Sequence, residues 1–212
     1  MKNKPSNQPP TDLGRRGAIF GSSALAASLL IPNIASAAEE SILRTSASGI
    51  RVLSVSFKNN GIDMAGDLYL PKAFSKSGKY PAIVSVHPGG GVKEQTAGLY
   101  AQKLAEQGFI ALAFDASHQG ASGGMPRLLD DPIRRVADIY SAVDYLTTLT
   151  YVDANRIGAL GICAGSGTAV KAASLEHRIK AIATVSAVDV GAAVRKGWDG
   201  KATREDQLAL LD

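Results

Sequence analysis

The amino-acid sequence predicts an α/β fold, a mostly parallel, doubly wound sheet with helices on both faces. After residue 80, short apolar runs alternate strictly with amphipathic segments, which is typical of parallel strands joined by crossover helices. Three segments rich in glycine and polar residues, 87–91, 115–122 and 161–165, each follow a predicted strand directly. Because ligand sites in such sheets lie beyond the carboxyl ends of the strands, these segments indicate a functional site at that edge.

The first two predicted strands form a hairpin. The segment from Ile50 to Phe57 has apolar residues in a strand pattern, and the segment from Met64 to Leu70 returns as a second strand. The sequence Asn59-Asn60-Gly61 between them is a turn signal. We therefore expect these two strands to precede the alternating part of the chain.

The other predicted elements alternate along the chain. Each strand is a short apolar run, and each long helix has apolar residues spaced for one face. The predicted strands are 82–86, 109–114, 157–162 and 179–185, and the predicted helices are 96–107, 132–149 and 167–173. A further helix start is expected at Thr203. This order predicts parallel strands with helices covering both faces of the sheet.

The N-terminal segment, residues 1–37, has the pattern of an export signal. The paired Arg15 and Arg16 precede an apolar stretch over 18–31, and the small-residue site Ala35-Ser36-Ala37 follows. Paired arginines favour the twin-arginine export machinery, so we expect an exported, periplasmic or secreted bacterial protein whose single domain is 38–212. The alternative is an uncleaved membrane anchor, although the apolar stretch is shorter than the roughly 20 residues that a span needs.

Charge and cysteine content exclude several classes of protein. Without residues 1–37 the chain holds 19 basic and 18 acidic side chains, so nothing indicates a nucleic-acid surface. The sequence has no phosphate-binding glycine loop, no dinucleotide-binding G-x-G-x-x-G in its first strand–helix unit and no cluster of metal-ligating cysteines and histidines. We therefore expect no cofactor and no metal. The single cysteine also excludes an internal disulfide.

Cys163 lies in the pattern G-x-C-x-G over residues 161–165, which places a cysteine at the serine position of a nucleophile elbow. In that motif a sharp turn from strand to helix lifts the nucleophile clear of the sheet, and glycines are needed because nearby side chains would collide. The N-terminus of the following helix favours a thiolate. The alternative interpretation is a small buried hydrophobic residue. Ser166 is a weaker match, because Ala164 and Thr168 occupy the two positions where the motif has glycine.

Together these motifs resemble those of the α/β-hydrolase superfamily, and more narrowly its dienelactone-hydrolase-like branch, which uses cysteine at the elbow. The resemblance runs from about residue 50 to about residue 189. It rests on the sequence His87-Pro88-Gly89-Gly90-Gly91, on residues 115–122 and 153–158, and on the elbow. It implies an α/β-hydrolase fold and a small-molecule ester or lactone as the substrate.

The resemblance also implies roles for the site residues. Cys163 would attack an ester or lactone carbonyl and form a thioester acyl-enzyme. The backbone N–H of Ala164 would be one donor to the oxyanion, and Gly89 or Gly90 would supply the other. His87 is expected to order the glycine loop by hydrogen bonding. The alternative interpretation of the glycine loop is an ordinary turn.

The acid and the histidine follow the nucleophile in the superfamily, and here the sequence departs from that pattern. The one histidine after Cys163 is His177, which we expect on the surface. His118 is a candidate base and Asp189 is a candidate acid, because each follows a predicted strand. We therefore expect the chain to hold the N-terminal portion of the fold. The alternative function is a truncated product or pseudoenzyme that binds a small molecule or a partner without turnover.

Overall fold

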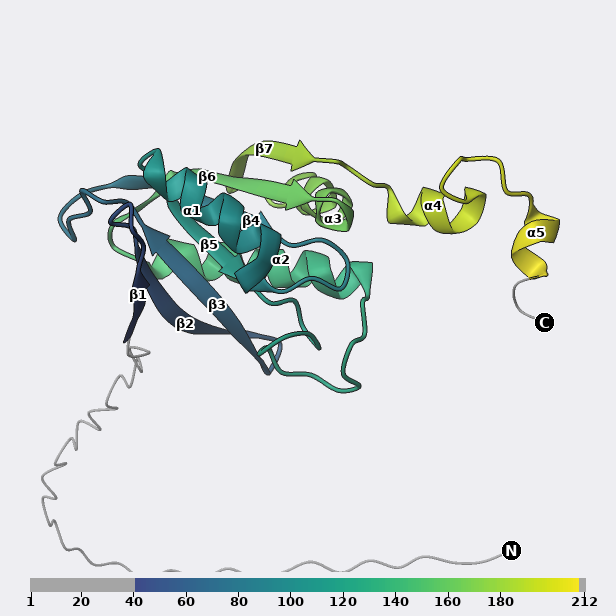
Figure 1. The fold of residues 1–212 in the computed structure, drawn as a ribbon, viewed down its shortest axis with the longest axis horizontal. Coiled ribbons are helices and arrows are strands. Elements are labelled where there is room, and N and C mark those ends of the chain that lie inside the picture. The colour runs from purple at the N-terminus through teal and green to yellow at the C-terminus, as the bar shows by residue number, and fades with distance from the viewer. Residues whose placement is uncertain (1–40, 210–212) are drawn as a thin grey trace, which may run out of the picture. The chain divides into compact units, whose positions relative to one another are not determined.

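The computed structural model describes residues 41–209, which form a seven-stranded sheet with helices packed against it (Figure 1). The predicted export signal over 1–37 lies outside these residues. The strands are β1 (Ser41–Thr45), β2 (Arg51–Asn59), β3 (Ile62–Leu70), β4 (Tyr80–Val86), β5 (Ile110–Phe114), β6 (Val152–Ile162) and β7 (Ile179–Val185). The helices are the π-helix η1 (Lys93–Ala97), α1 (Gly98–Glu106), α2 (Pro132–Thr148), α3 (Ala164–Ala173), α4 (Val190–Lys196) and α5 (Arg204–Leu208).

The strands lie in the order β1-β2-β3-β5-β4-β6-β7. The pairs β1–β2, β2–β3 and β3–β5 are antiparallel, whereas β5, β4, β6 and β7 run parallel to one another. The predicted hairpin is confirmed, since Asn59 pairs with Ile62 across the turn. The predicted mostly parallel sheet is confirmed as well, and β4 lies between β5 and β6.

Helices cover both faces of the sheet, as the alternation predicts. Helix α1 packs on one face against β3, β4 and β5, and α2 and α3 pack side by side on the other. The larger apolar core lies under α2 and α3 and includes Val84, Leu112, Ile139, Leu146 and Ala169. The smaller core lies under α1 and includes Tyr69, Ala101, Ala105, Ala111 and Leu160. These two cores bury the centre of the sheet and fix the strand ends that carry the site.

Several element boundaries differ from the sequence-based prediction. Strand β6 begins at Val152, because its first residue already pairs with Tyr80 of β4 before a register shift. Helix α3 begins at Ala164, directly after Cys163, and the predicted start at Gly167 is wrong. Strand β1 and helix α4 were not predicted, whereas the predicted helix at Thr203 is confirmed, since the Thr203 side chain caps α5.

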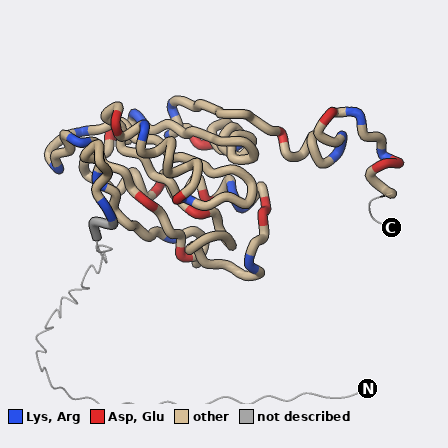
Figure 2. The backbone as a smooth tube through the Cα atoms, in the orientation of Figure 1, with Lys and Arg blue, Asp and Glu red and all other residues tan. Residues whose placement is uncertain are grey.

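Basic and acidic residues are interspersed along the described part of the chain (Figure 2). No helix within residues 41–209 has the length and apolar character that crossing a membrane requires. In the same range, no group of three or more histidine, cysteine, aspartate or glutamate side chains is placed to hold a metal ion.

Candidate active site

Cys163 forms the turn between β6 and α3, with φ of 54° and ψ of −120°. This left-handed conformation is costly for a residue with a side chain and persists only where its surroundings enforce it. Backbone hydrogen bonds do so here. The Cys163 N–H donates to the Val185 carbonyl at 2.9 Å, and the Cys163 carbonyl accepts from the Ser166 N–H at 2.9 Å. The cysteine is half-buried and packs against the smaller apolar core, so the alternative interpretation as a buried apolar residue stays open.

The two glycines of the elbow are required by space. A Cβ atom on Gly161 would lie 2.4 Å from the Cα of Ser166, and one on Gly165 would lie 2.5 Å from the Val86 carbonyl oxygen. Real Cβ atoms do not approach backbone this closely, so the collision predicted from the motif is confirmed. Ser166 is fully buried and its hydroxyl donates to the Gly161 carbonyl at 2.8 Å. Its role is to brace the turn.

The glycine loop after β4 lies beside the elbow. A Cβ on Gly89 would be 3.5 Å from the Cβ of Ala164, so the two residues predicted to bind the oxyanion are neighbours. Ala164 is the first residue of α3, where a backbone N–H has no acceptor within the helix. The loop is also a turn: the Gly91 N–H donates to the Pro88 carbonyl at 3.1 Å, and Gly90 has φ of 63°. The two interpretations of this loop are therefore compatible.

His87 orders the glycine loop, as its position predicts. Its Nε2 accepts from the Ala116 N–H at 3.1 Å, so Nδ1 carries the proton and donates to the Pro88 carbonyl at 2.6 Å. Burial, together with the nearby Arg135 charge, lowers the pKa of His87 below its ordinary value. A neutral imidazole with both nitrogens engaged is a structural link between two loops.

The segment after β5 is held by the carboxylate of Asp115, which is almost fully buried. Its oxygens accept from the backbone N–H groups of Lys93 at 2.7 Å and Ala121 at 2.8 Å, and Lys93 Nζ lies 3.2 Å away. A Cβ on Gly120 would be 2.3 Å from Asp115 Oδ2, so glycine allows the loop to fold over the carboxylate. Asp115 therefore has a structural role beside the site.

His118, the candidate base, lies within its own loop. It has φ of 71° and is buried, and its Nδ1 lies 3.0 Å from the Pro126 carbonyl. Its Nε2 has no hydrogen-bond partner among the residues that the structure describes. Within residues 41–209, no hydrogen bond joins the Cys163 thiol to a histidine. The assignment of His118 as a base stays a prediction.

Asp189, the candidate acid, caps the short helix α4. Its carboxylate accepts from the Ala192 N–H at 2.9 Å and is exposed. The residue follows β7, at the same edge of the sheet as the elbow, because the Val188 N–H lies 3.4 Å from the Cys163 carbonyl. His177 is exposed in the turn after α3, as expected.

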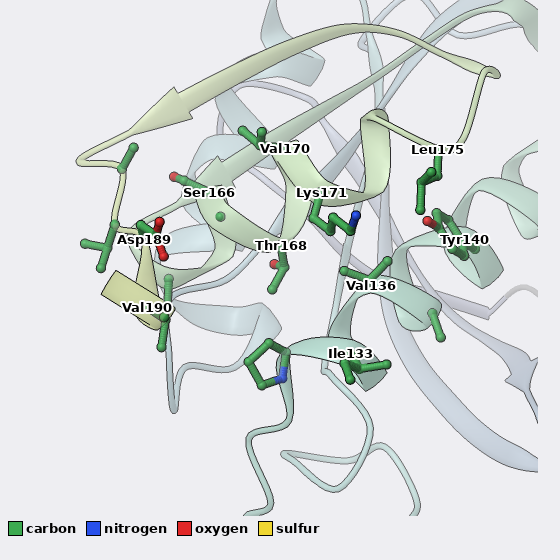
Figure 3. A pocket seen from close by; sticks show the side chains of 17 residues that line it. Ile133, Val136, Tyr140, Ser166, Thr168, Val170, Lys171, Leu175, Asp189 and Val190 are labelled. Carbon is green, nitrogen blue, oxygen red and sulfur yellow. The ribbon is translucent and has the colours of Figure 1, made fainter. Parts of the chain in front are cut away.

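A pocket of about 790 Å³ opens beside the elbow (Figure 3). Helix α3 forms one wall, the N-terminal half of α2 the second, and residues 187–191 the third. Most of its lining is apolar, and its labelled apolar side chains are Ile133, Val136, Val170, Leu175 and Val190. Ala164 also lines the pocket, which connects it to the position predicted for the oxyanion.

Two buried charged residues of α2 support the site and were not predicted from the sequence. The Asp138 carboxylate accepts from Asn59 Nδ2, from the Ser117 N–H at 2.9 Å and from the Ser117 hydroxyl. Arg135 donates to the backbone carbonyl of His87. Their sequence neighbourhood is that of an ordinary amphipathic helix, so no local signal marks them as buried.

The sheet order, the strand–cysteine–helix turn and the adjacent glycine loop define an α/β-hydrolase-fold protein. Residues 64–188 match the model of the dienelactone hydrolase family, which covers more than half of the chain. The chain therefore belongs to the dienelactone hydrolase family. The predicted fold class and the predicted family are both confirmed.

Relatives and solved structures agree with this assignment. The protein YcjY of Escherichia coli (strain K12) is 53% identical over 161 residues, which are 74% of this chain and 53% of YcjY. The thiohydrolase aneE of Aspergillus aculeatus is 32% identical over 126 residues, 59% of this chain and 38% of aneE. The crystal structure of the protein PA2218 from Pseudomonas aeruginosa matches with a TM-score of 0.75 at 41% identity, over 79% of this chain and 52% of PA2218. The chain spans about half the length of the curated relatives that it matches first.

Proposed function

We propose that the protein hydrolyses ester or lactone bonds through a nucleophilic Cys163 and an acyl-enzyme intermediate. The observation that carries this proposal is the strained elbow, which presents a half-buried cysteine beside Gly89 and the N-terminus of α3. A structural cysteine needs neither a left-handed backbone nor two glycines that admit no side chain. The geometry instead fits a nucleophile held next to oxyanion donors.

The proposed reaction has two steps. The Cys163 thiolate attacks the carbonyl carbon, the C–S bond forms, and the C–O bond breaks as the alkoxide leaves and takes up a proton. Water then attacks the thioester carbon and gives up one proton to the solvent, which balances the proton taken up in the first step; the C–S bond breaks, and the carboxylic acid and the thiolate are released. In both steps the N–H groups of Ala164 and the glycine loop would bind the negative oxygen, each worth about 2.7–4 kcal/mol of transition-state stabilisation.

The pocket beside Ala164 supports an apolar acyl group in the substrate. Its walls are mostly apolar, and a pocket of this volume can hold a small to medium ligand. The relative aneE is named a thiohydrolase, so thioesters belong among the substrates to test beside esters and lactones.

A second candidate is a protein that binds a small molecule or a partner without turnover. This alternative is favoured by the contacts of the three histidines, because none of them bonds to the Cys163 thiol within the described residues. Without a general base, the acyl-enzyme would form slowly or fail to hydrolyse.

Release of p-nitrophenol from p-nitrophenyl acetate by the whole chain tests the two functions. We expect Cys163→Ala to abolish the release above background, and Ser174→Ala, an exposed hydroxyl at the end of α3, to leave it unchanged. Equal rates for wild type and Cys163→Ala would reject the nucleophile. A single burst without further turnover would favour the second candidate.

A further inference from the structure

Arg135 is a buried cation that the proposed chemistry does not yet use. It is the fourth residue of α2, and only 4% of its side chain is exposed. Its Nη2 donates to the backbone carbonyl of His87, and its Nη1 lies 3.6 Å from Asp130 Oδ1. Its Nε has no hydrogen-bond partner among residues 41–209. Burying a guanidinium is costly, so a site that keeps one needs its hydrogen bonds.

The His87 carbonyl, which Arg135 binds, lies next to the elbow. A Cβ on Gly165 would be 2.6 Å from the His87 carbonyl oxygen, so this carbonyl touches the first turn of α3. The same peptide begins the glycine loop, and two residues later Gly89 faces Ala164. A shift of the His87 carbonyl would therefore move the loop relative to the elbow.

Asp130 connects the cation to the loop a second time. Its Oδ1 is the partner of Arg135, and its Oδ2 would lie 3.5 Å from a Cβ on Gly89. Burial lowers the pKa of Arg135, while the charges of Asp130 and Asp138 act against that shift. The guanidinium remains charged near neutral pH because its ordinary pKa is far above 7. Arg135 thus binds the loop at its first residue, His87, and its partner Asp130 lies close to the middle of the loop at Gly89.

We propose that Arg135 is a positioning residue that holds the glycine loop in register with the elbow, so that a loop N–H and the Ala164 N–H meet at one oxyanion. This proposal rests on the proposed function for its catalytic consequence. Its structural consequence, an ordered glycine loop, does not depend on catalysis.

Two reactions of the Cys163 thiol distinguish an effect on the position of the oxyanion donors from an effect on the thiol itself. Acetylation of Cys163 by p-nitrophenyl acetate passes through an oxyanion, whereas alkylation by iodoacetamide needs the thiolate but no oxyanion. For Arg135→Gln we expect the acetylation rate to fall, since a misplaced donor forfeits part of its effect. The Arg135 charge also interacts with Cys163, so its loss acts on the thiol in both reactions, and it is the ratio of the acetylation rate to the alkylation rate that should fall about 10- to 100-fold.

Matched variants control for charge and folding. Arg134→Gln removes the neighbouring, exposed arginine of the same helix and should leave both rates unchanged. Arg135→Lys keeps the cation but loses the planar fork, so its acetylation rate should lie between wild type and Arg135→Gln. If Arg135→Gln does not fold, Arg135→Lys still gives the ratio of the two rates.

Amide hydrogen exchange of the segment 87–92 gives a readout without catalysis. We expect faster exchange in Arg135→Gln than in wild type or Arg134→Gln. Unchanged exchange would overturn the proposal, and so would an equal fall of acetylation and alkylation. If wild-type Cys163 is not acetylated at all, the proposed function fails, and the exchange experiment alone decides the role of Arg135.

Discussion

At the scale of single residues, the site depends on backbone strain at Cys163. A left-handed non-glycine residue costs on the order of 1–3 kcal/mol, and the neighbouring glycines allow the chain to bear it. Gly161 and Gly165 admit the tight approach of α3 to β6 and to the loop after β4. The sequence predicts this part correctly, because the reason for the glycines is local and steric.

Substitution of Gly165 tests the steric argument. Gly165→Ala would place a methyl group 2.5 Å from the Val86 carbonyl oxygen, so we expect the free energy of unfolding to fall by about 1–3 kcal/mol. The control is Gly123→Ala, whose Cβ would meet nothing nearer than 3.4 Å. Urea denaturation of both variants measures the difference. Equal stability of the two variants would contradict the account of the elbow.

The buried His87 predicts a pH dependence of stability. Burial lowers its pKa in the folded chain below 6.5, so between the two pKa values the unfolded chain binds more protons. The contribution of His87 is therefore complete above about pH 6.5 and is lost as the pH falls.

Wild type and His87→Asn isolate this effect, because other titrating groups are common to both. The stability advantage of wild type should be larger at about pH 7.5 than at about pH 5. Urea denaturation at both pH values measures it. An advantage that is constant or grows toward acid would mean that His87 is not held neutral.

At the scale of elements, α2 ties the site to the antiparallel part of the sheet. Asp138 joins this helix to Asn59 at the β2–β3 turn and to Ser117 after β5. Burial raises the pKa of Asp138, and the hydrogen bonds from Ser117 and Asn59 act in the opposite direction. The Asp138 carboxylate is thus the common hydrogen-bond acceptor for the β2–β3 turn and for the loop after β5.

Asp138→Ala should be strongly destabilising for that reason. Removing the carboxylate leaves buried donors of Ser117 and Asn59 without an acceptor, at about 1–3 kcal/mol each, so we expect a loss of at least about 3 kcal/mol. Asp144→Ala, on the exposed face of α2, removes only a surface ion pair with Arg178 and should cost less than about 1 kcal/mol. Thermal and urea unfolding compare them. Similar losses of unfolding free energy in the two variants would show that the Asp138 carboxylate does not hold the Asn59 and Ser117 loops.

The elements show where prediction from the sequence succeeds. Elements with a strong local signal, such as the continuous apolar run of β5 and the periodic apolar face of α2, are where the sequence predicts them. The start of β6 depends on a pairing with the distant Tyr80, and the burial of Arg135 and Asp138 depends on loops from β4 and β5. These features arise from tertiary contacts, so no pattern local to the chain reveals them.

At the scale of the whole molecule, the sheet brings three separate loops to one edge. The glycine loop follows β4, the Asp115 segment follows β5, and the elbow follows β6, with parallel strands in common register. The edge strand β7 completes the described sheet, and residues 180–184 on it are exposed. The fold therefore brings Cys163, Ala164 and the glycine loop together at one edge of the sheet, where we propose that they act as the nucleophile and the oxyanion donors.

Intact-mass spectrometry of the whole chain mixed with p-nitrophenyl acetate tests the central claim most directly. The account predicts the rapid gain of one acetyl group, located by peptide mapping on Cys163 and absent in Cys163→Ala. It further predicts that Gly89→Pro, which removes one candidate donor N–H, slows this gain. Acetyl groups confined to lysines, or an equal gain in Cys163→Ala, would contradict the account.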